Sequence, residues 1–102
     1  MSRKLPSLRP EDLDHVLDLD WALAKVTFPD ADGLEPNRDL YGVVNAVLAA
    51  DDRVMVPFGL FGRYLRYRQF REVRTLGDRF TKGLVLREEF EPPPYQAPSE
   101  AA

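Results

Sequence analysis

The chain has 102 residues, of which 44% are hydrophobic, so it can form one domain with a modest core and is not wholly disordered. It has no cysteine, which excludes disulfides and thiolate metal sites, and no apolar run close to the roughly 20 residues of a membrane span. The net charge of −3 conceals two halves of opposite sign, because residues 10–52 carry −9 and residues 53–87 carry +7.

The first predicted element is a helix over residues 10–26. Pro10-Glu11-Asp12 favours a helix start, because proline fits the first turn and acids complement the positive end of the helix dipole. Apolar residues then follow at spacings of three and four in two adjoining stripes: Leu13, Val16, Leu17, Trp21 and Ala24, and Leu19, Leu23 and Val26. The stripes are wider than one core requires. We therefore expect a partner on this helix as well, with Leu19, Trp21 and Leu23 as anchors.

Asp20 interrupts the apolar part of this helix. A buried carboxylate without a partner is costly, so Asp20 should meet an arginine or a set of backbone donors. We count it among the candidate interface residues.

The middle of the chain predicts a loop, a second helix and a short strand. Residues 28–33 are rich in turn formers, and apolar spacing predicts a helix over residues 37–50. Asp51-Asp52 would oppose the dipole of that helix, which indicates a sharp exit of the chain. Residues 53–56 read as a strand that pairs with a second one at residues 84–86.

The third predicted helix covers residues 57–76 and stops at Gly77. Its apolar positions lie on one face, and the opposite face carries Arg63, Tyr64, Tyr67, Arg68, Arg71 and Arg74. Interleaved arginine and tyrosine side chains can hold phosphates and stack on bases, so nucleic-acid binding is an alternative function. The competing interpretation is that this basic face docks on the chain's own acidic first helix.

Residues 91–102 predict a flexible tail rich in proline, alanine and acid. Within it, the segment from Pro92 to Tyr95 has three prolines followed by a tyrosine, which is typical of polyproline ligands for aromatic grooves. Pro93 and Tyr95 are therefore candidate contacts with a protein partner.

The sequence predicts a mainly α fold: a small three-helix domain at residues 10–90 with a two-stranded β pair, an extension at residues 1–9 and the tail. An α+β fold is the alternative. The three serines lie near the ends of the chain and there is one histidine, so we expect no catalytic site, metal or cofactor. We expect a small non-catalytic interaction protein, a subunit, adaptor or assembly factor that binds protein partners or its own copies. The lack of cysteine fits the reducing cytoplasm, and the excess of arginine over lysine, 11 to 3, suggests a bacterial or phage source.

Overall fold

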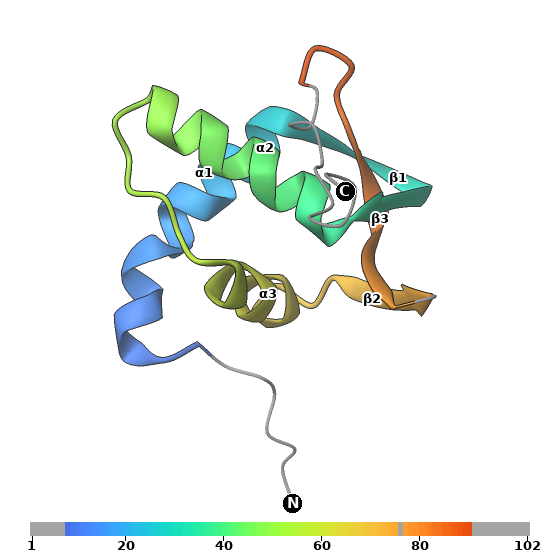
Figure 1. The fold of residues 1–102 in the computed structure, drawn as a ribbon, viewed down its shortest axis with the longest axis horizontal. Coiled ribbons are helices and arrows are strands. Elements are labelled where there is room, and N and C mark those ends of the chain that lie inside the picture. Colours follow the sequence, from blue (N-terminus) through green and yellow to red (C-terminus); the bar gives the residue numbers. More distant parts are fainter. Residues whose placement is uncertain (1–7, 76, 91–102) are drawn as a thin grey trace, which may run out of the picture.

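The computed structural model describes residues 8–75 and 77–90, which form helices and a small sheet (Figure 1). The elements follow in the order 3₁₀ helix η1 (Pro10–His15), α1 (Val16–Val26), β1 (Thr27–Pro36), α2 (Asn37–Ala50), α3 (Phe58–Tyr67), β2 (Arg71–Thr75) and β3 (Asp78–Leu86). The strands form one antiparallel sheet in the order β1-β3-β2.

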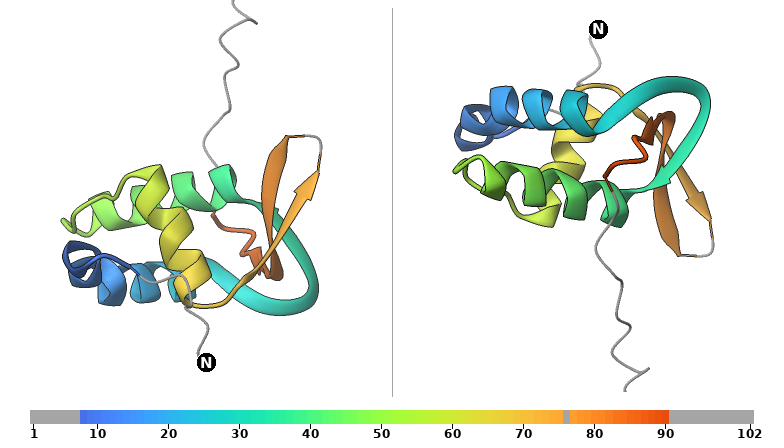
Figure 2. Two further views of the ribbon diagram at one scale, coloured as in Figure 1. Left: turned by 90° about the horizontal axis from the view of Figure 1, so that it is seen from below. Right: turned by 90° about the horizontal axis from the view of Figure 1, so that it is seen from above.

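The helices pack on one another at one end of the molecule, and the sheet lies at the other (Figures 1 and 2). Figure 2 shows α1 and α2 side by side with α3 crossing both. Their inward side chains make the core, and the largest fully buried ones among them are Leu19, Val26, Leu40, Val44, Leu48, Phe61 and Tyr64. Leu84 brings the sheet into the same core.

The predictions for the first two helices are confirmed. η1 and α1 together cover residues 10–26, and α2 has the predicted bounds. The sharp exit after α2 is confirmed too: Asp52 has φ of +60°, and the N–H of Arg53 donates back to the carbonyl of Leu48 over 2.8 Å. This left-handed turn satisfies a carbonyl that the helix end leaves free.

The predicted third helix is too long, because α3 ends at Tyr67 rather than at residue 76. Gln69 adopts a left-handed backbone with φ of +65°, and the N–H of Phe70 donates to the carbonyl of Leu65 over 3.0 Å. The chain then leaves as β2. A glutamine gives no warning of a helix stop, since glycine is the usual residue there.

The loop predicted at residues 28–33 belongs to β1. Proline, aspartate and glycine argue against a strand, but β1 is an edge strand, where prolines are tolerated. Its pairing with β3 is interrupted between Pro29 and Leu34, and Asp30 Oδ1 accepts from the N–H of Asp32 over 2.9 Å in that break.

The strand predicted at residues 53–56 is absent from the structure. Asn45 of α2 takes the place of a partner strand: its Nδ2 donates to the carbonyl of Val56 over 2.9 Å, and its Oδ1 accepts from the N–H of Val56 over 3.0 Å. Residues 84–86 do form a strand, but they pair with Thr27–Pro29 instead.

The fold is therefore α+β, with a three-stranded antiparallel sheet, and not mainly α with a two-stranded pair. No helix within the described residues is long and apolar enough to cross a membrane. The predicted tail, with Pro93 and Tyr95, lies outside the described residues.

Candidate functional site

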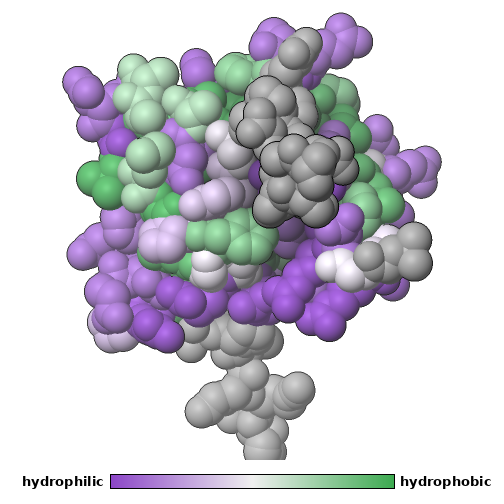
Figure 3. All heavy atoms as spheres, in the orientation of Figure 1, coloured by the Kyte–Doolittle hydropathy of each residue, from purple (hydrophilic) through white to green (hydrophobic). Residues whose placement is uncertain are grey.

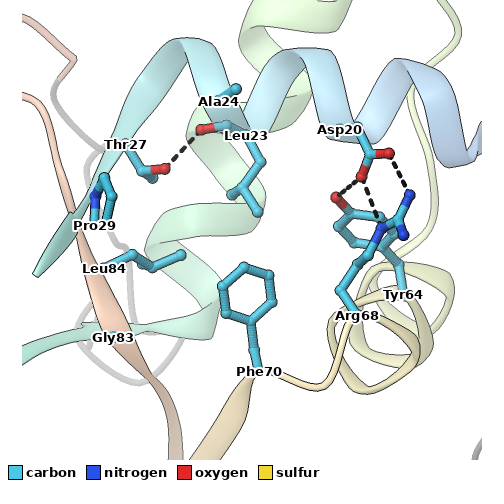
Figure 4. A pocket seen from close by; sticks show the side chains of 10 residues that line it. All are labelled: Asp20, Leu23, Ala24, Thr27, Pro29, Tyr64, Arg68, Phe70, Gly83 and Leu84. Carbon is cyan, nitrogen blue, oxygen red and sulfur yellow. Dashed lines mark hydrogen bonds and ion pairs between the residues drawn. The ribbon is translucent and has the colours of Figure 1, made fainter. Parts of the chain in front are cut away.

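Asp20 of α1 is bonded to Tyr64 of α3 and to Arg68, the residue that follows this helix (Figure 4). The Tyr64 hydroxyl donates to Asp20 Oδ1 over 2.5 Å, and Arg68 Nε donates to the same oxygen over 3.0 Å. Arg68 Nη2 donates to the other oxygen, Oδ2. Two-pronged pairing of this kind is the strong form of an arginine–carboxylate bond. The prediction that Asp20 meets an arginine is confirmed.

Tyr64 supplies the buried part of this cluster. Its side chain is 1% exposed, and this burial, followed by the hydrogen bond to Asp20, raises the pKa of the phenol. The hydroxyl therefore stays protonated at neutral pH and remains a donor to the carboxylate. The side chains of Tyr64, Arg68 and Asp20 form hydrogen bonds with one another, and these bonds hold α3 against α1.

A second ion pair joins α3 to η1. Arg63 Nε donates to Asp12 Oδ2 over 3.1 Å, and Asp12, in η1, is 3% exposed. The hydrogen bond from Arg63 holds the pKa of the Asp12 carboxyl below its ordinary value. Asp12 also accepts from the backbone N–H of Arg9 over 3.3 Å, which closes the first turn of η1.

The structure does not bring the predicted arginine–tyrosine face together on one helix. Arg63 and Arg68 bind acids of the same chain, and Tyr64 is in the core. Arg71 and Arg74 belong to β2 because α3 has already ended. Tyr67 remains on α3, half-buried, with the Arg68 guanidinium 5.3 Å from its ring centre. The interpretation that this basic region docks on the acidic first helix fits the two ion pairs.

A pocket of about 320 Å³ opens beside the Asp20 cluster (Figure 4). Leu23, Thr27, Phe70 and Leu84 line its apolar part, and the polar trio stands at one side. The Thr27 hydroxyl donates to the carbonyl of Leu23 over 2.7 Å, so it too has a partner within the chain.

The candidate anchors on α1 have different environments. Leu19 is 0% and Leu23 is 6% exposed, so both belong to the protein's own core and a partner cannot reach them. Trp21 is half-buried, and the Arg53 guanidinium lies over its ring at 3.9 Å from the centre. Arg53 is fixed there by hydrogen bonds to Asp18, over 2.7 Å, and to Asp51, over 2.6 Å. These bonds hold the loop after α2 beside α1.

Further exposed apolar residues lie on η1, on α1 and on the loop after α2, and those of the loop are ones that sequence reasoning assigned to a strand. Leu13 is 50% exposed and Leu17 is 79% exposed, while Val54 and Met55 on the neighbouring loop are 63% and 57% exposed. Figure 3 shows hydrophobic residues at the surface of that loop. The width of the apolar cover on residues 10–26 signalled that one stripe would face outward, but spacing alone did not tell which stripe.

Among residues 8–75 and 77–90, no three histidine, cysteine or acidic side chains converge as metal ligands would. No protein-family model matches the sequence, and comparisons with curated proteins and with solved structures find no significant match.

Proposed function

We propose that this protein is a non-catalytic interaction module, a subunit, adaptor or assembly factor, that binds a protein partner through one surface. We call this surface the α1 surface. It consists of Leu13, Leu17, Trp21, Val54 and Met55. The observation that carries the proposal is the 79% exposure of Leu17 in the first turn of a helix whose other face is packed into the core.

The α1 surface has the composition of a contact site. Leu17 and Trp21 are one turn of α1 apart, and Leu13 lies in η1, which precedes this helix. Beside Trp21 lies a hollow of about 310 Å³ that is also lined by Val47, Ala50 and Phe90. An indole next to a hollow and exposed leucines provides the apolar centre that binding energy usually requires.

The surrounding charges define the partner. Glu11 and Asp14 flank Leu13, and Asp51 and Asp52 precede Val54, all of them exposed. Asp18 and Asp51 both bind the same base, Arg53. Together with the other acids, they give this surface a negative surrounding. A complementary partner presents apolar side chains with lysine or arginine around them.

The experiment compares two leucine substitutions in the full chain. Tagged wild type, Leu17→Lys and Leu34→Lys are purified from the native host, and the proteins retained with each are measured by quantitative mass spectrometry. Leu34 is the matched control, an exposed leucine on the sheet rather than on α1. We expect Leu17→Lys to reduce the retained partner about tenfold, as the loss of a central contact does, and Leu34→Lys to leave it unchanged.

The only tryptophan of the chain gives a second readout. Because Trp21 is part of the α1 surface, addition of the purified partner should change its fluorescence. The proposal is wrong if both variants retain the same proteins as wild type, or if the partner binds without changing the emission of Trp21.

Nucleic-acid binding has less support than a protein partner. It depended on six side chains on one helix face. Four of these bond within the chain, and two of the six lie on a strand.

A further inference from the structure

The outer edge of β2 is open to another strand. In the order β1-β3-β2, the strands β1 and β2 are the two edges of the sheet. The edge of β1 is protected by Pro29, Pro36 and the break in its register. β2 has five residues with no proline and no break, and Figure 2 shows no other described helix or strand beside its outer side. Among residues 8–75 and 77–90, only β3 pairs with β2, so its other side offers backbone groups to a further strand.

The sequence of β2 is complementary to itself when two copies run antiparallel. With Val73 on the twofold axis, Glu72 stands opposite Arg74 of the second copy, and Arg74 stands opposite its Glu72. Arg71 meets Thr75, and Val73 meets Val73. Opposite charges on directly facing residues stabilise an antiparallel pair, and like charges destabilise it.

Neighbouring registers lack this complementarity. A shift of the pairing by one residue in one direction sets Arg71 against Arg74, and in the other direction it leaves both charged residues opposite uncharged ones. A shift by two sets Glu72 against Glu72, or Arg74 against Arg74. Only the register centred on Val73 pairs every charge of Glu72 and Arg74.

The same register extends an apolar row of the sheet. Val73 pairs with Phe80 of β3, and Phe80 pairs with Pro36 of β1, so the three lie in one row across the sheet. The next residue of β3, Thr81, is 2% exposed and donates to Asn37 Oδ1 of α2 over 2.6 Å, so it faces the helices. Side chains alternate along a strand, so Phe80 and Val73 face the other side of the sheet, where they are half-exposed. Val73 of a second copy would continue this row.

The excess of arginine around β2 adds a second reason. Glu72 has Arg74 at 3.5 Å, Arg79 at 3.6 Å and Arg66 at 3.9 Å, so one carboxylate is shared by three guanidinium groups. Figure 3 shows the hydrophilic side chains gathered along α3 and β2. Pairing of two β2 strands would place a second carboxylate opposite Arg74.

We propose that two copies of this protein associate through β2, in the register centred on Val73, to form one continuous antiparallel sheet. The partner at this edge is a second copy of the chain, and the contact is separate from the α1 surface.

Charge exchange tests the register. Wild type, Glu72→Arg and Arg74→Glu are studied by sedimentation over a range of concentrations, alone and as an equimolar mixture of the two variants. We expect wild type to dimerise. The dimer affinity of each variant alone should be lower by about tenfold at least, because each variant places like charges opposite one another. In the mixture both pairs are again opposite in charge, so the two variants should form a heterodimer.

Two further variants keep the result clear. Val73→Lys places two ammonium groups on the twofold axis without removing an ion pair of Glu72, so it should abolish dimerisation. It replaces Glu72→Arg as the test if circular dichroism shows that Glu72→Arg is unfolded. Leu17→Lys, on the α1 surface, should leave the dimer unchanged. A wild type that stays monomeric at millimolar concentration overturns the proposal. So does a dimer that persists in Val73→Lys, or a mixture of folded variants that stays monomeric.

Discussion

Gly33 lies where β1 approaches β3 too closely for a side chain. A Cβ atom at this position would lie 2.4 Å from the carbonyl oxygen of Leu84 and 2.9 Å from Val85 Cγ1. The first of these is a backbone atom that cannot rotate away. We therefore expect Gly33→Ala to lower the free energy of unfolding by about 1–3 kcal/mol, the range for added volume in a packed site, as measured by urea denaturation.

Gly59→Ala is the matched control for this prediction. Gly59 lies in the first turn of α3, and an added Cβ there would have only Arg63 Nη1 nearby, at 3.6 Å. Alanine is a better helix former than glycine, so this change should leave the stability unchanged or raise it by up to about 1 kcal/mol. Equal effects of the two substitutions would contradict the close approach of β1 to β3.

Asp20 shows how far residue-level reasoning from the sequence reached. The cost of burying a lone carboxylate predicted an arginine or a set of backbone donors, and Arg68 is the partner, although the Asp20 side chain is 35% exposed and not buried. Tyr64 could not be foreseen as its second partner, because it was assigned to the exposed face of a longer helix. Asp20 and Tyr64 are 44 residues apart, so only the crossing of α3 over α1 brings them together.

At the level of single elements, the end of α3 is the most informative position. Gln69 is exposed and has φ of +65°, a left-handed conformation that is unfavourable for residues with a Cβ atom. Glycine adopts it without this cost. We expect Gln69→Gly to raise the free energy of unfolding by up to about 1 kcal/mol, because the strain relieved exceeds the entropy lost.

Ala46→Gly is the control for Gln69→Gly. Ala46 is exposed in the middle of α2, where glycine should lower the stability by about 0.5–1 kcal/mol. Thermal melts of both variants beside wild type check the signs. If Gln69→Gly destabilises as much as Ala46→Gly does, then α3 continues past Tyr67.

The errors in the predicted elements have a common cause in tertiary contacts. Helices α1 and α2 were predicted correctly because their apolar spacing reflects the core they face. β1 was missed because its prolines and Gly33 are tolerated only at an edge strand held by β3, a contact more than 40 residues away. Residues 53–56 were assigned to a strand from their local sequence. That sequence does not show that the backbone of Val56 is bonded to the side chain of Asn45, 11 residues away.

At the scale of the whole molecule, ion pairs between the acidic and basic halves add to the packing of the hydrophobic core. Arg53, Arg63 and Arg68 bind Asp18, Asp12 and Asp20, over sequence separations of 35, 51 and 48 residues. Each arginine comes from the basic half and each acid from the acidic half. The charge division seen in the sequence therefore corresponds to contacts between the two halves in the fold. These contacts orient α3 and the loop after α2 against η1 and α1.

These pairs make the stability of the fold sensitive to salt. The arginine side chains are 33%, 29% and 41% exposed, so each pair contributes only a fraction of the energy of a buried one, and salt screens it. The net charge of −3 is small, so salt screening of the overall repulsion adds little stability to offset the loss from the ion pairs.

We expect the free energy of unfolding to fall by about 1 kcal/mol between roughly 20 mM and 300 mM NaCl, the sum for three partly exposed pairs. Urea denaturation suits this measurement because urea is uncharged. Arg68→Gln should reduce the salt dependence, while Arg66→Gln, whose nearest carboxylate oxygen is 3.9 Å away on Glu72, should not. A stability that rises with NaCl over this range would show that the two halves do not hold each other.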